Sequence, residues 1–335
     1  MTSTAARFSR FLFILLVTLP AASPPVGAQA PVLRYGQALS AARSIYSLPV
    51  VVAEREGFFR REGLDFRTVI PLPGGAERMI AALHDDTVDV THVATPFLVR
   101  AALAGSDAVA IAAEFNNPVY SLVARPEIRS IAELRGKLVG MADPAGSISI
   151  SMLKLFALHG VREADLRIRT IDGTPARLAC LKRGECVAVP LGQPQDLLAQ
   201  SEGYRILGLS TEAVPEFLYT VTAARRSWAA RNPDVVVRYV RGLAASFRFI
   251  RDPANRAAVV QAIVETTGVS AAVAGQTLAL YFEPERKVPP RQGEIDPEGL
   301  ASVIAFMAEA GQLKAPLPAP ERFADLQYLR LAGIR

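Results

Sequence analysis

Residues 32–70, VLRYGQALSAARSIYSLPVVVAEREGFFRREGLDFRTVI, decide the fold class. Two short β-prone runs, 32–37 and 64–70, enclose an amphipathic stretch at 48–60 that predicts a helix. The same alternation continues with predicted helices at 76–83 and 96–103 and predicted strands at 88–93 and 108–113. Strands separated by helices of about ten residues predict an α/β fold with a parallel sheet and helices on both of its faces.

A second set of the same units follows the β-prone run 119–123. Its predicted strands are 137–141, 167–171, 187–190 and 205–209, and its predicted helices are 148–158, 176–182 and 194–200. After another β-prone run at 217–222 the pattern becomes helical, at 234–250, 257–266, 271–281 and 297–310. These last helices have no new strands to cover, so we expect them to return to the first lobe. Two extended crossings, near Tyr120 and Tyr219, then form a hinge.

The amino terminus has the three parts of a secretory signal. Arg7 and Arg10 form a cationic start, residues 11–19 are apolar, and Ala28-Gln29-Ala30 is a small-x-small cleavage site. The apolar run is shorter than the roughly 20 residues of a bilayer span, and a retained anchor or a buried first helix is the alternative. No Cys stands directly after the cleavage site, where a lipid would be attached. We therefore expect residues 1–30 to be removed and the mature chain to be free in the periplasm.

Composition limits the classes of partner. Removing residues 1–30 leaves 305 residues and takes away two Arg and no acidic residue, so the formal charge falls from +5 to +3. No dense Lys/Arg stripe suggests nucleic acid, which requires a clustered basic face. A hydrophobic fraction of 50% supports a large core, and chains of this length tend to form two domains. We expect a monomer.

The chain has two cysteines, Cys180 and Cys186. An oxidising compartment and an even count favour a short-loop disulfide, whereas two separate thiols at a helix end and a strand start are the alternative. The spacing is not Cys-x-x-Cys, so neither alternative predicts redox catalysis.

Small and hydroxyl-bearing residues follow the predicted strands. In open α/β sheets the ligand crevice lies beyond the carboxyl ends of the strands, where the next helices begin. Exposed amide groups at such helix starts favour carboxylate, sulfonate or phosphate oxygens, although Ser, Thr and Gly are also ordinary caps. The turns concerned are 41–47, 73–76, 94–97, 143–149 and 191–194. Further cleft candidates, for which core packing is the alternative, are Tyr46, Phe97, Asn116, Asn117, Tyr120 and Tyr219.

The sequence offers little support for catalysis. His84, His92 and His159 lack metal-ligand spacing, and no Gly-x-Ser-x-Gly, Walker loop or His-Glu-x-x-His occurs. We expect these histidines to be surface or packing residues. The prediction is therefore a protein that is not an enzyme and that has no cofactor and no metal site.

Three motifs resemble a known family. Residues 48–65, LPVVVAEREGFFRREGLD, resemble the first helix of the periplasmic solute-binding proteins of nitrate, sulfonate, taurine and thiamine-precursor importers. Residues 88–90 before Thr95-Pro96, and SIAELRGKLVG at 130–140, are similar to later motifs of that family. The resemblance implies a type II periplasmic binding fold, with lobe I at 31–120 plus 221–335 and lobe II at 121–220.

The resemblance also implies a role and a site. The protein is expected to bind a small molecule, to dock on an ABC permease with its ATPase, and to contact the membrane only through that permease. Family ligand positions carry over to Ser44, Tyr46, Gly74, Gly75, Thr95, Pro96, Gly146, Ser147 and Gln193, beside the candidates Asn117, Tyr120 and Tyr219.

The chain departs from the nitrate and sulfonate patterns where polar groups might hold an oxyanion, because Ile45, Ala145 and Leu191 stand there. The solute therefore stays open between an inorganic anion and an organic acid or heterocycle with an apolar body. Two rival functions remain. One is an enzyme on the same fold that resembles a thiamine-pyrimidine-precursor synthase, and the other is an adaptor that presents ligand to a membrane sensor.

Overall fold

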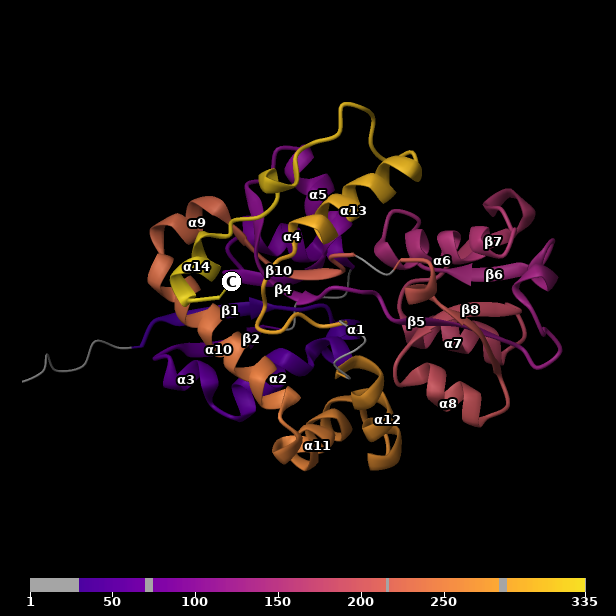
Figure 1. Cartoon of the computed structure of the whole chain (residues 1–335), viewed down its shortest axis with the longest axis horizontal. Coiled ribbons are helices and arrows are strands. Elements are labelled where there is room, and N and C mark those ends of the chain that lie inside the picture. Colours follow the sequence, from indigo (N-terminus) through magenta and orange to yellow (C-terminus); the bar gives the residue numbers. More distant parts are fainter. Residues whose placement is uncertain (1–29, 70–74, 215–216, 283–287, 335) are drawn as a thin grey trace, which may run out of the picture. The chain divides into compact units, whose positions relative to one another are not determined.

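Two five-stranded sheets carry the fold in the computed structural model, which describes residues 30–69, 75–214, 217–282 and 288–334 (Figure 1). Sheet A has the order β2-β1-β3-β10-β4, and sheet B has the order β7-β6-β8-β5-β9. The strands of sheet A are β1 (Val32–Gly36), β2 (Asp65–Val69), β3 (Val90–Ala94), β4 (Ala108–Phe115) and β10 (Thr220–Arg225). Those of sheet B are β5 (Tyr120–Ala124), β6 (Leu138–Met141), β7 (Arg167–Thr170), β8 (Ala188–Gly192) and β9 (Arg205–Leu209).

The predicted parallel pairing holds for β1, β2 and β3 and for β6, β7 and β8, but each sheet also contains an antiparallel strand that was not predicted. Strand β10 lies between β3 and β4 and runs antiparallel to both, and β5 does the same between β8 and β9. The reason is the route of the chain. A strand that arrives from the other sheet enters at the edge where the parallel strands end, so it must run in the opposite direction. The α/β class and the helix-flanked sheets are confirmed.

Helices cover both faces of each sheet, as the alternating pattern predicts. Helices α4 and α5 lie on one side of sheet A and α2 and α10 on the other, while α6 lies opposite α7 and α8 on sheet B (Figure 1). The helices before and within sheet B's segment are α1 (Leu39–Ala42), α2 (Leu48–Arg55), α3 (Phe58–Arg61), α4 (Ala76–His84), α5 (Thr95–Leu103), α6 (Ser147–Leu158), α7 (Thr174–Lys182) and α8 (Gln195–Ser201). The later ones are α9 (Arg226–Arg231), α10 (Pro233–Arg251), α11 (Arg256–Thr267), α12 (Ala271–Phe282), α13 (Pro297–Glu309) and α14 (Gln327–Ala332).

The motif Gly57-Phe58-Phe59 has a clear structural role. Gly57 adopts φ 69°, a left-handed conformation that glycine tolerates, and so divides the predicted helix 48–60 into α2 and α3. The turn buries Phe59, whose ring stacks on Phe66 at 4.1 Å and on Tyr239 at 5.4 Å between centroids. The motif therefore fixes α10 against the first βαβ unit.

A charged residue lies inside sheet A. Glu114 is fully buried and accepts hydrogen bonds from Thr222 Oγ1 at 2.7 Å and from the Tyr35 hydroxyl at 3.3 Å. Its other carboxylate oxygen contacts Nδ1 of His92. Because these groups satisfy the carboxylate, the cluster is a packed polar network within the sheet, and His92 belongs to it.

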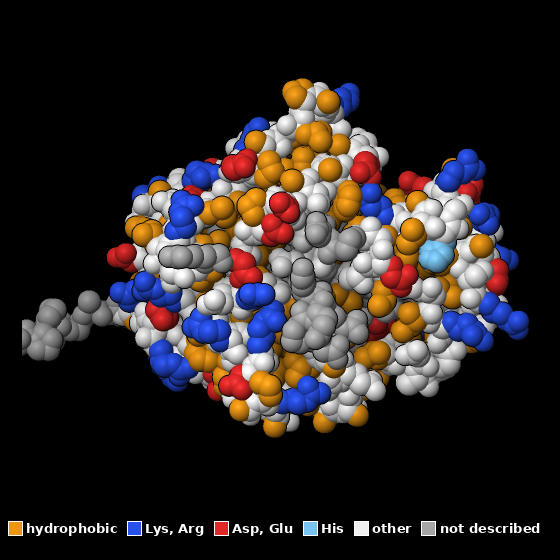
Figure 2. Space-filling model, viewed as in Figure 1, with side chains coloured by type: hydrophobic (Ala, Val, Ile, Leu, Met, Phe, Trp, Pro, Cys, Tyr) orange, Lys and Arg blue, Asp and Glu red, His pale blue; other side chains and the backbone are white. Residues whose placement is uncertain are grey.

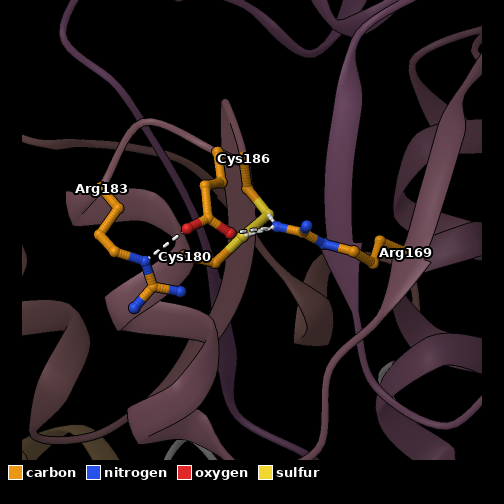
Figure 3. Close-up of a disulfide and its surroundings, with 5 residues drawn as sticks. Arg169, Cys180, Arg183 and Cys186 are labelled. Atoms are coloured by element: carbon orange, nitrogen blue, oxygen red, sulfur yellow. Dashed lines mark hydrogen bonds and ion pairs between the residues drawn. A yellow bond between two sulfur atoms is a disulfide. The ribbon is translucent and has the colours of Figure 1, made fainter.

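Cys180 and Cys186 form a disulfide that joins the end of α7 to the start of β8 (Figure 3). Both sulfur-bearing residues are buried. Arg169 places a guanidinium nitrogen 2.7 Å from the Cys180 sulfur and 2.9 Å from Glu185 Oε2. The disulfide lies at the amino end of β8, the edge of sheet B away from the predicted crevice.

Residues Pro31–Arg335 form one compact unit. Among the described helices, none is by itself long and apolar enough to span a membrane, although residues 253–267 and 271–282, bent by 108°, meet that test as a pair. The lobe boundaries stay a prediction, and residues 1–29 of the predicted leader peptide lie outside the described residues.

Candidate functional site

The two chain crossings bring the carboxyl edges of both sheets to one place. The chain leaves sheet A at Phe115 and enters sheet B at Tyr120, and it returns between Leu209 and Thr220. Because β5 and β10 run antiparallel to their neighbours, their first residues lie at the edge where the parallel strands end. Tyr120 pairs with Gly192, at the end of β8, and Thr220 pairs with Ala94, at the end of β3.

Four tyrosines gather at these crossings. The ring of Tyr46 lies 5.2 Å from that of Tyr219, 6.0 Å from Tyr120 and 5.8 Å from Tyr281, measured between centroids. The hydroxyls of Tyr120 and Tyr219 are 3.2 Å apart. Burial raises the pKa of Tyr46, Tyr219 and Tyr281 well above the usual value of 10.0, so these phenols stay protonated. The cluster offers flat apolar faces together with hydroxyl groups.

Tyr281 connects the two sheets through Gln193. Its hydroxyl donates to Gln193 Oε1 at 2.6 Å and lies 3.2 Å from the carbonyl oxygen of Val119, within the first crossing. Gln193 Nε2 in turn donates to Asp196 Oδ2 at 2.6 Å, which Ser121 Oγ also contacts at 2.5 Å. Since Nε2 is engaged by the carboxylate, the amide presents its oxygen to Tyr281. The sequence analysis missed Tyr281 and Asp196.

Several predicted residues do meet at this edge. Thr95, fully buried at the start of α5, donates from Oγ1 to the carbonyl oxygen of Tyr219 at 3.3 Å. A Cβ built on Gly146 would lie 3.4 Å from the Phe97 ring, so the start of α6 on sheet B approaches the start of α5 on sheet A. Arg100 strengthens this approach by donating to the carbonyl oxygen of Ala145 at 3.1 Å.

Other predicted residues lie elsewhere or have local roles. Ser44 caps its own turn, because its Oγ donates to the carbonyl oxygen of Ala41 at 2.7 Å and accepts from the amide of Tyr46. Gly75 is exposed before α4, and Pro96 is buried in the first turn of α5. Gly74 lies outside the described residues. Ser44 and Gly75 therefore have the weakest structural support as ligand contacts.

Within the residues that the structure describes, five buried polar atoms at the carboxyl edges have no hydrogen-bond partner. They are Gln37 Nε2 beyond β1, Asn116 Oδ1 and Asn117 Oδ1 in the first crossing, Ser147 Oγ at the start of α6 and Thr220 Oγ1 at the start of β10. As whole residues, all of them except Asn116 are less than 5% exposed. An unpaired buried polar group costs about 1–3 kcal/mol, so a cluster of them at one edge indicates groups kept for a ligand.

A buried arginine, Arg177, lies at the same edge of sheet B. Arg177 of α7 donates from Nε to the carbonyl oxygen of Pro190 at 2.8 Å and from a terminal nitrogen to that of Ile171 at 3.1 Å. The sequence analysis missed it, because an arginine in a short amphipathic helix reads as a surface residue.

Features away from this edge give little sign of a site. A surface hollow of about 410 Å³, lined partly by Ser106, Asp107 and Arg226, lies at the amino end of β4, the opposite edge of sheet A. Among the described residues, no three His, Cys, Asp or Glu side chains gather as metal ligands. Basic and acidic side chains are interspersed on the face shown in Figure 2. The carboxyl edges therefore remain the candidate site.

Comparison with known proteins gives the chain's relationships. Residues 44–257 match the family model described as NMT1/THI5 like. A candidate binding protein of Bacillus subtilis, YtlA, is 26% identical over 211 residues, which are 60% of this chain. That match spans 61% of the relative's own length.

Solved structures share the fold. The periplasmic nitrate-binding protein NrtA from Synechocystis has a TM-score of 0.75 at 12% identity and covers 91% of this chain and 89% of its own. The alkanesulfonate-binding protein SsuA from Xanthomonas axonopodis, bound to MOPS, has a TM-score of 0.71 at 17% identity, covering 88% and 99%. The desulfurization enzyme DSZB has a TM-score of 0.65 at 15% identity, covering 90% and 98%. The fold thus occurs in binding proteins and in an enzyme.

Proposed function

This chain belongs to the NMT1/THI5-like family, and from that premise we propose that it is the extracytoplasmic solute-binding receptor of an ABC-type importer. It binds a small polar or anionic organic solute between the carboxyl edges of its two sheets. The observation that carries the proposal is the set of unpartnered buried atoms on Gln37, Asn117, Ser147 and Thr220, which lie on both sheets and on a crossing. A solute with several polar atoms can form hydrogen bonds with these groups, which have no partner among the described residues.

Hinge closure is the proposed mechanism. The candidate edge residues are almost fully buried, so a solute reaches them only after contacts such as Tyr281–Gln193 have broken. Opening needs rotation in the two crossings alone, since these are the chain connections between the sheets' segments. A solute that contacts both edges then favours the closed state by its differential affinity.

The proposed partners and location follow from the same role. We expect a permease and its ATPase to recognise the closed form, with the protein monomeric, free of a lipid anchor and located in the periplasm after removal of residues 1–30. NrtA, which shares this fold, is a periplasmic nitrate-binding protein, and this supports the proposed location. The residues that we propose as solute contacts are Tyr46, Thr95, Asn117, Tyr120, Gly146, Ser147, Gln193 and Tyr219.

The enzyme alternative keeps one supporting observation, because DSZB has this fold. We favour a receptor, since the site is built of buried tyrosines and amides, and its Ser121–Asp196 contact belongs to the buried network with Gln193. Mass spectrometry of the solute after prolonged incubation separates the two functions, because a receptor returns the solute unchanged.

A ligand screen tests the receptor function. The protein, expressed with its own leader and purified, is screened by thermal unfolding against carboxylates, sulfonates, inorganic anions and neutral heterocycles. A solute at 100 times its Kd stabilises the folded state by about 2.7 kcal/mol, so at least one class should raise Tm in a concentration-dependent way. A flat response to every class contradicts a receptor.

A matched pair of variants locates the site. Ser147→Ala removes a buried hydroxyl at the start of α6 that has no partner among the described residues. Ser201→Ala removes an exposed hydroxyl at the end of α8 that donates to the carbonyl oxygen of Leu198 in the same helix. We expect Ser147→Ala to weaken solute binding by about tenfold, the effect of one hydrogen bond. Ser201→Ala should bind like the unmodified protein, and equal affinities for all three proteins contradict this location.

A further inference from the structure

Arg177 is a buried cation without an ion pair in the described part of the chain. It is 2% exposed, and it donates to two carbonyl oxygens and to the Thr174 hydroxyl, the last at 3.1 Å. Five N–H groups are available on a guanidinium and three are engaged. Asp172, a carboxylate whose charge acts on the guanidinium, is exposed and forms no ion pair with it. A buried charge with only neutral partners is costly, so a counter-charge is expected from outside the chain.

The position of Arg177 follows from the strand order. Strand β6 lies between β7 and β8 in sheet B. Arg177 donates to Ile171, just beyond β7, and to Pro190 of β8, so its guanidinium spans the carboxyl end of β6. The chain leaves β6 at Met141 and begins α6 at Ser147. The guanidinium therefore lies at the strand end from which the chain leads into α6, whose first residue Ser147 has a buried hydroxyl with no partner among the described residues.

The tyrosine cluster lies close to this cation along β8. Arg177 donates to the carbonyl oxygen of Pro190, and Tyr120 pairs with Gly192, two residues further along the same strand. A Cβ built on Gly192 would lie 3.3 Å from the Tyr120 ring. Tyr46 and Tyr120 present nearly parallel rings, 19° apart in plane angle with centroids 6.0 Å apart. The surroundings thus combine a positive charge, spare donors and flat aromatic faces.

We propose that Arg177 anchors the single anionic group of the solute, a carboxylate or sulfonate, whose planar body packs against the rings of Tyr46 and Tyr120. This inference rests on the proposed receptor function and names its solute class. The two unengaged N–H groups of Arg177 face an anion whose other oxygens bond Ser147 Oγ and amides at the start of α6, where the helix dipole also favours negative charge.

Other solute classes fit this constellation less well. A neutral heterocycle leaves the buried guanidinium without a counter-charge. A small inorganic anion satisfies the charge but leaves the aromatic faces without a partner. A cation is repelled. Among the described residues, the unpartnered Gln37 Nε2, Ser147 Oγ and Thr220 Oγ1 can each donate a hydrogen bond to an oxygen-rich anion.

Calorimetry tests the solute class on the unmodified protein with pairs of probes that are similar in shape but differ in charge. The probes are benzoate against benzamide and benzenesulfonate against benzenesulfonamide, with nitrate, sulfate and benzylammonium in parallel. We expect at least one aromatic anion to bind about 100-fold more tightly than its neutral partner, since a buried charge pair loses that much when one charge is missing. Equal affinities within a pair, or binding of inorganic anions alone, overturn the proposal.

Variants assign the effect to this side chain. Arg177→Met should reduce aromatic-anion affinity by about 100-fold and leave neutral-probe affinity unchanged, and Arg177→Lys should retain part of the preference. Arg183→Met is the control, because it removes the same charge from an exposed position at the end of the same helix. A folded Arg177→Met protein that binds anions normally contradicts the proposal.

Two results separate this inference from the receptor function. If Arg177→Met does not fold, the pairs of anionic and neutral probes still decide the solute class on the unmodified protein. If none of the probes binds, the aromatic-anion class is wrong, while a hit from another class in the thermal screen keeps the receptor function.

Discussion

The Tyr281 hydroxyl donates a 2.6 Å hydrogen bond to Gln193, and this bond joins helix α12 to the turn that follows β8. Helix α12 packs on α11, which packs on α2 beside sheet A. The bond therefore spans the two sheets without using either crossing. Its strength contributes directly to how tightly the two carboxyl edges are held together.

Tyr281→Phe tests this contact. The variant leaves the buried Gln193 oxygen without its donor, so we expect a loss of about 1–3 kcal/mol in the free energy of unfolding and faster solute release. Urea denaturation and stopped-flow release measure the two effects. Tyr204→Phe is the control, because no hydrogen bond of its half-buried hydroxyl is found among the described residues. Equal losses for both variants would show that the bond adds no stability.

Asp196 should make stability depend on pH. Burial raises its pKa above the usual 3.8, so the folded state binds the proton more tightly than the unfolded state. The resulting stability is complete below pH 3.8 and is lost as pH rises through the raised pKa. Relative to Asp196→Asn, the unmodified protein should thus lose stability across that window in urea titrations.

Asp65 provides the control of opposite sign. Its hydrogen bonds from Arg67 lower its pKa, so its contribution is present above pH 3.8 and is lost as pH falls. Relative to Asp65→Asn, the unmodified protein should gain stability as pH rises. The same trend for both pairs of proteins would contradict the assignment.

The Cys180–Cys186 disulfide should affect stability but not binding. It closes a short loop, with a separation of 6 residues, for which the chain-entropy relation gives about 2 kcal/mol. We expect the double variant Cys180→Ala, Cys186→Ala to lose that amount in urea denaturation. Because the disulfide lies at the amino end of β8, solute affinity should not change, and a large loss of affinity would be unexpected.

A pair of glycine variants tests the packing of α10. A Cβ on Gly242 would lie 2.5 Å from the Phe59 ring, so Gly242→Ala should cost about 1–3 kcal/mol through overpacking. Gly275 in α12 has more space, with its nearest contact at 3.9 Å, and Gly275→Ala should stabilise the helix by up to about 1 kcal/mol. Thermal unfolding of both proteins measures the difference, and two effects of the same sign would contradict this packing.

Local sequence patterns predicted most of the architecture. The alternation of short β-prone runs with amphipathic stretches identified both sheets, because each element depends on neighbours within a few residues. The antiparallel direction of β5 and β10 was not predicted, since it depends on where the chain enters a sheet. The division of the predicted helix 48–60 at Gly57 was not predicted either, because it depends on the left-handed backbone of this glycine.

The site was predicted less completely than the fold. Tyr46, Tyr120 and Tyr219 were selected for their places at crossings and strand ends, and the structure brings their rings together. Arg177 and Tyr281 were missed because each occupies an unremarkable helical position. Tyr281 acts through a residue 88 positions away in sequence, Gln193. Arg177 bonds residues 3 to 13 positions away, which the order of the strands brings around its guanidinium. A solute contact at the other predicted positions stays a prediction.

The placement of β10 between β3 and β4 sets an order for assembly. All strands of sheet B lie within residues 120–209, so this sheet can form as soon as that continuous segment is available. Sheet A instead cannot be completed until residues 220–225 are available, because they form β10, which lies between β3 and β4. Strand β4 pairs with no other strand of this sheet. A polypeptide delivered amino terminus first therefore completes its middle segment before its beginning, with β4 held as an unpaired hydrophobic edge in the meantime.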